Sequence, residues 1–457
     1  MYKHSISYYK DYSLDISNIN QQTSINKHQS LNIPIPISMN SVYDFVIIGS
    51  GIAGLYSAYK ILHMSPDSPI IILERNKKSW LGGRTSNVDF YGANIVTGAG
   101  VGRQNKDRLL MRLLDELEIP HPKYSVTKEY GKDVTRSDIT KTISYLKTRY
   151  NKNPDLYKGE TFRNFAIKLL GVTEYHNFVT STGYTDYENA DIHDVLYYYG
   201  MDDNSAKLEA FYVPWKKLVD DMIKWLLQYN VIIKSSSNVT KINKLDDCKE
   251  TCGFVVSCEN GEKYKCKRTV VATTISSIHK LFPIDKFPIY KQIHGQPFLR
   301  LYGKFSGKSA LLMKNAVKSL TIVSGPLYKI IPIDTKRNVY MIVYNDNAGS
   351  VFFKNHLKNT STNRNLYARL LEKSLGLPFD SLKLDAIIDF YWPIGTHYYE
   401  PLSSEYKNRV DFIKQAQHPG NGIVVVGEVV ALKQGWVEGA LDSVESVITK
   451  KWTHGVC

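Results

Sequence analysis

The sequence contains no apolar run near the roughly 18 residues that a membrane-spanning helix needs. Cysteine is scarce, with five residues in 457, and few, unpaired thiols are typical of a reducing compartment. Residues 1–22 are interrupted by polar side chains, so they lack the apolar segment of a secretion signal. We expect a cytoplasmic or other intracellular protein that is not secreted. The richness in Tyr, Lys, Asn and Ile is typical of AT-rich genomes such as those of large DNA viruses, for which a virion is the alternative location.

Several catalytic and metal-binding patterns are also absent. The sequence has no Ser-His-Asp arrangement, no H-E-x-x-H motif and no zinc-finger spacing. Four of the cysteines, Cys248, Cys252, Cys258 and Cys266, span 19 residues. A predicted hairpin at Asn260-Gly261 places the last two on separate strands, so we expect isolated thiols and no metal site.

Acidic residues are the minority among the charged ones. The 58 Lys and Arg against 44 Asp and Glu give a formal charge of +14, which favours anionic partners such as nucleic acid, an acidic surface or an acidic substrate. The basic residues are scattered in runs no longer than pairs, without an RNA-binding signature. Nucleic acid is therefore the less favoured of these partners.

The order of patterns along the chain indicates one domain assembled from several segments. Residues 1–40 show no sustained period, and we expect an extended arm there, with a homodimer contact as one role for it. Apolar runs predict strands at 43–48 and 70–73 around a helix at 54–64. Helical patterns dominate 109–227, and strand patterns follow. The remaining expected elements are strands at 298–305, 320–323, 328–333, 339–344 and 423–426, and helices at 365–375 and 437–450.

The strongest local pattern lies between the first two predicted strands. Gly49, Gly51 and Gly54 have the spacing G-x-G-x-x-G, and Glu74 lies 20 residues beyond the last of them. Glycines at these positions permit a tight turn, approach of the backbone to a pyrophosphate and close helix–strand packing. A helix N-terminus offers N–H groups to phosphates, and the acidic residue accepts hydrogen bonds from a ribose. The pattern predicts a dinucleotide-binding unit.

Two further motifs follow in the chain. Gly82-Gly83-Arg84 lies after Glu74, and Gly427-Glu428 precedes the segment Gly435-Trp436-Val437-Glu438-Gly439-Ala440. In this order the motifs resemble those of the FAD-dependent amine oxidase superfamily, which includes monoamine, polyamine and L-amino-acid oxidases. The resemblance extends over about residues 42–454 and is weak in the central region.

The resemblance implies an α/β fold, in which a Rossmann-like FAD-binding domain carries an inserted α+β substrate-binding domain. After the arm at 1–40, it places the FAD-binding domain at 41–112, 228–290 and 386–457. The substrate-binding domain is then expected to have a helical part at 113–227 and a mixed-sheet part at 291–385.

The same resemblance assigns residues to FAD. Arg84 is implied to contact the phosphate or the flavin, Glu428 the ribityl or phosphate region, and the backbone at Val437 the pyrimidine end of the flavin. Relatives with covalent flavin have a cysteine near the position of His397, so no thioether link is expected; a histidyl link is the alternative to noncovalent FAD. The complete implied set is Gly49, Ser50, Gly51, Ala53, Gly54, Glu74, Arg75, Gly83, Arg84, Gly98, Ala99, Val239, Glu428, Trp436 and Val437.

Four residues are candidates for the substrate side of the flavin. Trp436 and Tyr398 are expected to form its aromatic walls. Arg300 occupies the position at which relatives carry a lysine that holds a water molecule, and its larger head could hold an anion or block that water. Lys304 lies four residues on, on the same face of the strand. The arginine that binds substrate carboxylate in L-amino-acid oxidases is replaced by Val101; only a changed loop would let the nearby Arg103 take its place.

The resemblance implies an oxidase that transfers hydride from an amine or amino acid to FAD, with imine hydrolysis and formation of hydrogen peroxide from dioxygen. One alternative is a protein with this fold that has a structural or binding role. Another is a different FAD oxidoreductase of the same group, similar to protoporphyrinogen oxidase. The charge of +14 repels a cationic polyamine, so it favours an acidic substrate or surface partner.

Overall fold

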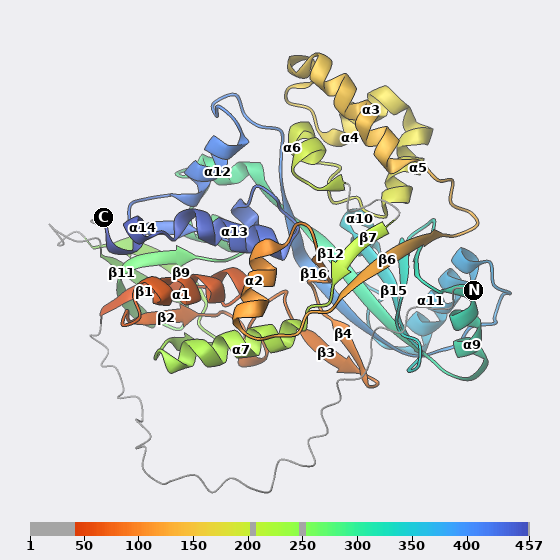
Figure 1. Ribbon diagram of the computed structural model, residues 1–457, viewed down its shortest axis with the longest axis horizontal. Helices are drawn as coiled ribbons and strands as arrows, with labels where there is room; N and C mark the ends of the chain where they lie inside the picture. Colours follow the sequence, from red (N-terminus) through yellow and green to blue (C-terminus); the bar gives the residue numbers. More distant parts are fainter. Residues whose placement is uncertain (1–41, 202–206, 246–252, 456–457) are drawn as a thin grey trace, which may run out of the picture.

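The computed structural model describes residues 42–201, 207–245 and 253–455. These residues form two large sheets, each covered by helices, that lie beside one another (Figure 1). The expected arm at 1–40, with its role in a dimer, lies outside the described residues, as do Cys248 and Cys252.

The first sheet has seven strands and is assembled from three separate stretches of the chain. Its order is β8-β2-β1-β11-β10-β9, and β17 pairs with β11. The predicted strands at 43–48 and 70–73 are confirmed, and they pair in parallel as β1 and β2. The predicted hairpin at Asn260-Gly261 joins β10 to β11. The strands are β1 (Val42–Ile48), β2 (Ile70–Leu73), β8 (Ile232–Lys234), β9 (Val239–Lys244), β10 (Phe254–Cys258), β11 (Lys263–Val271) and β17 (Ile423–Val425).

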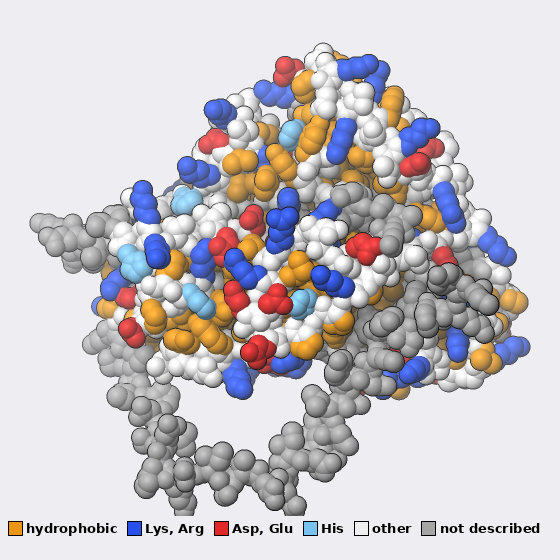
Figure 2. All heavy atoms as spheres, viewed as in Figure 1, with side chains coloured by type: hydrophobic (Ala, Val, Ile, Leu, Met, Phe, Trp, Pro, Cys, Tyr) orange, Lys and Arg blue, Asp and Glu red, His pale blue; other side chains and the backbone are white. Residues whose placement is uncertain are grey.

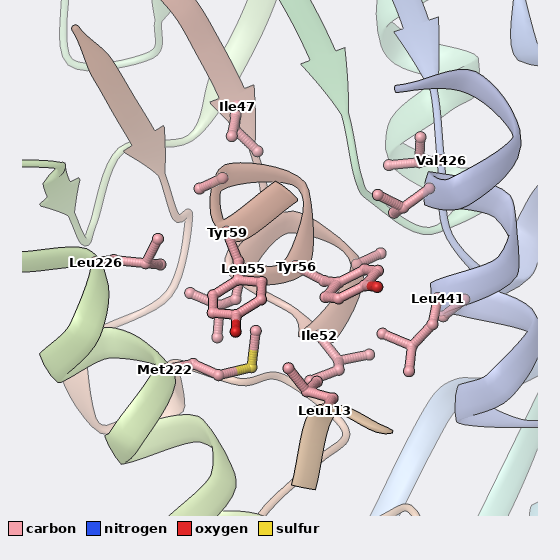
Figure 3. Close-up of a cluster of buried hydrophobic side chains, with 14 of the residues drawn as sticks. Ile47, Ile52, Leu55, Tyr56, Tyr59, Leu113, Met222, Leu226, Val426 and Leu441 are labelled. Atoms are coloured by element: carbon pink, nitrogen blue, oxygen red, sulfur yellow. The ribbon is translucent and has the colours of Figure 1, made fainter. Parts of the chain in front are cut away.

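Helices cover both faces of this sheet because its central strands are apolar on both sides. Phe45 and Ile47 of β1 pack with the helices of one face, while Val46 and Ile48 pack with those of the other. Figure 3 shows the first of these cores, where Leu55 and other side chains of α1 lie among residues of α2, α7 and α13. The first group is α1 (Ile52–Met64), α2 (Arg108–Glu116), α7 (Trp215–Gln228) and α13 (Val437–Val447), with α14 (Lys450–His454) beyond it; the second is α8 (Ile275–Leu281) and α12 (Arg409–Gln417).

Leu55 tests how much this core contributes to stability. Its side chain is fully buried in the core of Figure 3. We expect Leu55→Ala to lower the free energy of unfolding by about 2–5 kcal/mol, because the truncation removes apolar contacts and leaves a cavity. Leu227→Ala is the matched control, since Leu227 on α7 is 55% exposed. Urea denaturation of the two variants measures the difference, and equal losses would contradict the assigned core.

The second sheet has eight strands in the order β16-β12-β15-β14-β13-β6-β7-β5. The helices α9 (Gly307–Ala316) and α11 (Ser361–Leu375) pack on it, and α10 (Asn347–Phe352) follows β15. A small hairpin of β3 (Asn87–Phe90) and β4 (Ala93–Val96) lies against it. The strands are β5 (Gly102–Arg103), β6 (Lys123–Tyr130), β7 (Lys207–Phe211), β12 (Ile293–Phe305), β13 (Leu320–Ile322), β14 (Lys329–Asp334), β15 (Val339–Asp346) and β16 (Leu384–Tyr399).

A separate helical layer lies at the upper right of Figure 1 and has a core of its own. Its aromatic residues, such as Phe162, Phe178 and Tyr187, are fully buried against one another. The helices are α3 (Ile139–Lys152), α4 (Phe162–Leu170), α5 (Val172–Thr182) and α6 (Ile192–Tyr197).

Two of the expected domain limits differ from this arrangement. The segment expected to be helical, 113–227, contains β6 and β7 of the second sheet, and its last helix, α7, packs on the first sheet. The expected start of the third FAD-binding segment, residue 386, lies inside β16. Because β16 pairs with β12 along almost its whole length, the chain returns to the first sheet only after Tyr399.

Basic side chains are spread over the molecular face in Figure 2 rather than gathered into one stripe. This distribution matches the scattered basic residues of the sequence. Among the described residues, we find no helix with the length and apolar character needed to cross a membrane.

Candidate functional site

The glycine-rich turn between β1 and α1 is packed so tightly that two of its glycines admit no side chain. Gly49 has a positive φ of 105°, and a Cβ there would lie 2.4 Å from the carbonyl oxygen of Ala272. A Cβ on Gly54 would lie 2.0 Å from the carbonyl oxygen of Gly49. These contacts hold α1 close to the ends of β1 and β11, as the motif predicts.

Gly51 differs from these two glycines because it faces open space. A Cβ at this position would have no atom within 4 Å. Gly51 is also the N-cap residue of α1, so unpaired backbone N–H groups lie beside it. The free space and the N–H groups together fit a pyrophosphate.

Glu74 lies at the end of β2 and is tied to the same turn. Its carboxylate accepts hydrogen bonds from the backbone N–H of Ser50 at 3.0 Å and from the Ser50 hydroxyl at 2.7 Å. The backbone carbonyl of Glu74 accepts a hydrogen bond from the backbone N–H of Ser237 at 2.8 Å. Ser237 lies two residues before Val239, the first residue of β9. The neighbouring Arg75 is exposed. Glu74 thus lies beside the turn, with donors from the protein on both of its carboxylate oxygens.

The G-G-R segment packs directly on the glycine-rich turn. Gly83 has a positive φ of 59°, and its Cβ position lies 3.7 Å from the Cα of Gly51. On the other side, the carbonyl oxygen of Arg84 accepts from the N–H of Ala99 at 2.8 Å. A Cβ on Gly98 would lie 2.2 Å from that oxygen. Three segments predicted to bind one cofactor are therefore stacked side by side.

Glu428 is the centre of a buried polar cluster at the seam between the two sheets. One oxygen accepts from the backbone N–H groups of His397 and Gly435, both at 2.8 Å. The other accepts from the His397 ring at 2.5 Å and from Arg84 at 3.4 Å. Burial opposes ionisation, but His397 and Arg84 prevail and lower the pKa of Glu428 to about 2. Glu428 therefore joins β16 to the G-G-R segment as a carboxylate.

His397 uses both of its ring nitrogens inside the protein. Nδ1 contacts Glu428, and Nε2 accepts a hydrogen bond from the backbone N–H of Ile275 at 3.2 Å. The side chain is buried. Neither nitrogen is left to form a covalent bond to a flavin in this arrangement.

Trp436 lies directly before α13, which begins at Val437. The guanidinium carbon of Arg103 lies 3.8 Å from the centre of the Trp436 ring and covers one of its faces. Arg103 is held there by a buried ion pair with Asp107, with an N–O distance of 2.6 Å. Only the other face of the Trp436 ring can thus contact a ligand. The guanidinium of Arg103 is already paired with Asp107.

Arg300 and Lys304 share a face of β12, as predicted, but have different surroundings. The Arg300 guanidinium donates to the Tyr344 hydroxyl at 3.2 Å, and its Nη2 lies 3.3 Å from the Cβ position of Gly100. It is therefore next to the loop that contains Gly98 and Ala99. Lys304 donates instead to the carbonyl of Arg337, at the other end of β15. The structure thus separates the two candidates.

Tyr398 follows His397 on β16 and lies on the opposite face of the strand. Residues alternate between the two faces of a strand, and on β16 the His397 ring is directed to Glu428. Tyr398 packs against the helical layer and stacks on His294, with ring centres 5.1 Å apart. That Tyr398 and Trp436 form the two aromatic walls of one site stays a prediction.

The sequence analysis missed a group of buried residues around Arg300. Lys329 of β14 lies with its Nζ 4.1 Å from the centre of the Tyr344 ring and 2.9 Å from that of Tyr184. Two carboxylates, Asp186 and Asp346, are buried close by. Burial and the neighbouring Asp346 raise the pKa of Asp186 to about 7, and burial lowers the pKa of Lys329 well below its usual value. These residues carry no local motif, so no signal in the sequence pointed to them.

Within residues 42–201, 207–245 and 253–455, no group of three or more His, Cys, Asp or Glu side chains is placed to hold a metal ion. Cys258 and Cys266 lie on the neighbouring strands β10 and β11, and both thiols are free.

The sequence matches no protein-family model and no curated protein. Solved structures do match the fold. A single-substitution variant of putrescine oxidase, from a structure-based redesign of cofactor binding, aligns with a TM-score of 0.67 at 11% identity, over 88% of this chain and 97% of its own. Cyclohexylamine oxidase from Brevibacterium oxydans aligns with a TM-score of 0.68 at 12% identity, over 89% and 98%. The chain has the mixed α/β fold of these oxidases, which confirms the predicted fold class.

Proposed function

We propose that this protein binds FAD noncovalently along the first sheet and oxidises a small amine or amino acid, with dioxygen as the electron acceptor. The observation that carries the proposal is the free space at the Cβ position of Gly51, beside which lie Glu74 and the G-G-R segment. A dinucleotide fits there because its pyrophosphate meets N–H groups of α1 and its ribose meets a carboxylate. The fold shared with putrescine oxidase and cyclohexylamine oxidase supports the proposal.

In this proposal the residues of the chain bind and orient the reactants. Gly51 and Gly83 let the backbone approach the cofactor, and the free face of Trp436 shields the reacting atoms from water. Arg300 holds the substrate beside the Gly98–Ala99 loop. The bound flavin would supply the redox chemistry, which is removal of a hydride from the carbon next to the amine and reduction of dioxygen to hydrogen peroxide. Water would hydrolyse the resulting imine.

A structural or binding role is the second candidate, and the aromatic residues favour it. Arg103 covers one face of Trp436 and His294 stacks on Tyr398, so each of the two aromatic rings already has a partner within the protein. A protein of this kind would retain the fold without turning over an amine.

The visible spectrum of the purified protein distinguishes these functions. We expect a yellow protein that releases FAD when it is denatured, because both ring nitrogens of His397 already have partners within the protein. Under anaerobic conditions, amino acids or amines should bleach the flavin band. A protein without flavin after denaturation would refute the cofactor proposal, whereas a yellow protein that none of these substrates bleaches would favour the structural role.

A further inference from the structure

Arg300 is a buried cation without an anionic partner. Its side chain is 7% exposed, and none of the described carboxylates lies within 4.0 Å of its guanidinium. Its contacts are all with uncharged groups: the Tyr344 hydroxyl at 3.2 Å, the sulfur of Met341 at 3.8 Å and the Tyr302 side chain. An arginine cannot shed its proton in a protein, so the positive charge persists at the site.

Lys329 is a second buried basic group on the same tyrosine. Its Nζ has no hydrogen-bond partner among the described residues, although it lies over the Tyr344 and Tyr184 rings. The nearby carboxylates have other donors, since Asp346 accepts from Thr185 and Asp186 accepts from Tyr199. The two tyrosine rings thus form a cage that the protein fills with its own lysine.

This arrangement is unfavourable without a ligand. Desolvated charges are costly unless they are paired and hydrogen-bonded. A planar carboxylate matches the fork of a guanidinium, and Arg300 lies next to Gly100, which leaves room for its head group because it carries no Cβ. A second ammonium group would meet the Arg300 guanidinium here, and the cage that could hold it already contains Lys329.

We propose that the substrate carries a carboxylate beside its amine and that Arg300 binds this carboxylate, an assignment that rests on the proposed function. The site therefore takes amino acids or related acidic amines and rejects diamines. Tyr344 is a positioning residue, since its hydroxyl orients the guanidinium.

Two unreactive ligands of the same shape test the charge preference. Benzoate and benzamidine share a ring and a planar head group but carry opposite charges, and neither has a hydrogen on the carbon that would be oxidised. Calorimetric titration of the purified full-length protein should show benzoate binding at least about tenfold more tightly than benzamidine. Equal affinities, or tighter binding of benzamidine, would overturn the proposal without any variant.

The variant Arg300→Met removes the charge and keeps an apolar side chain of similar length. We expect benzoate affinity to fall about tenfold to a hundredfold, with benzamidine unaffected or bound more tightly. Arg300→Lys keeps the charge but loses the fork, so it should recover part of the affinity. Arg364→Met is the control, because Arg364 lies on α11 and hydrogen-bonds to Asn359.

A purely structural Arg300 would give a different result. Arg300→Met would then lower the midpoint of thermal unfolding and leave the ratio of benzoate to benzamidine affinity unchanged, which refutes the proposal. A protein that contains no flavin yet prefers benzoate through Arg300 would refute the proposed function and support the anion site. A protein that contains flavin and oxidises diamines faster than amino acids would refute the anion site alone.

Discussion

Replacing Gly51 by valine will weaken flavin binding strongly and leave the protein folded. The Cβ position of Gly51 is open, so the valine clashes with no protein atom near its Cβ. The new side chain instead fills the space into which a pyrophosphate must approach the N-terminus of α1. We expect the affinity for FAD to fall at least about tenfold. Flavin fluorescence after denaturation measures the content, and circular dichroism measures the fold.

Gly420→Val is the matched control for this result. Gly420 is exposed, its Cβ position is likewise open, and it lies between α12 and β17. The control protein should contain as much flavin as the wild type. Full flavin content in Gly51→Val would show that the cofactor does not lie against this turn.

The second large effect is expected at Glu428, whose carboxylate joins the two sheets. Glu428→Gln removes the charge that Arg84 and the His397 ring face in a buried seam. The pKa of Glu428 lies at about 2 instead of 4.5, and this shift corresponds to about 3 kcal/mol. We therefore expect the free energy of unfolding at pH 7 to fall by about 3 kcal/mol, as measured by urea denaturation.

The pH dependence follows from the direction of the shift. A carboxylate whose pKa is lowered in the folded state contributes its full stabilisation at pH values above its pKa in the unfolded chain. This contribution is lost as the pH falls from about 4.5 to about 2. In Glu428→Gln this part of the acid sensitivity should disappear. Glu400→Gln is the control, because Glu400 forms a histidine–glutamate pair with His294 that is only half-buried. Equal pH profiles for wild type and Glu428→Gln would contradict an ionised Glu428.

The dinucleotide turn was predictable because its chemistry is local. Gly49, Gly51 and Gly54 lie within six residues, and a strand followed by a helix leaves few arrangements for them. The burial of β1 and β2 likewise follows from their continuous apolar runs, which are typical of strands covered on both faces. The same reasoning missed β6, although Tyr124, Val126 and Tyr130 alternate with polar residues in the period of a strand.

The group around Arg300 was beyond prediction for the opposite reason. Lys329 and Asp346 lie on the consecutive strands β14 and β15, whereas Asp186 comes from the loop after α5, and each has an ordinary local context. Only the pairing of β15 with both β12 and β14 and the packing of the helical layer bring them together around Arg300. The position of Tyr398 shows the same limit, since a sequence indicates that neighbours on a strand face opposite ways but not which face meets the site.

The order of residues along the chain was thus sufficient for the α/β class, for the turn that fits a dinucleotide and for the acid at the end of β2. These features are signalled by short runs of residues, whose local geometry is limited by backbone sterics and hydrogen bonding. The seam at Glu428, the covered face of Trp436 and the unpaired charge of Arg300 were decided by tertiary packing. Burial sets the partners and the cost of each charge, and burial exists only when distant segments meet.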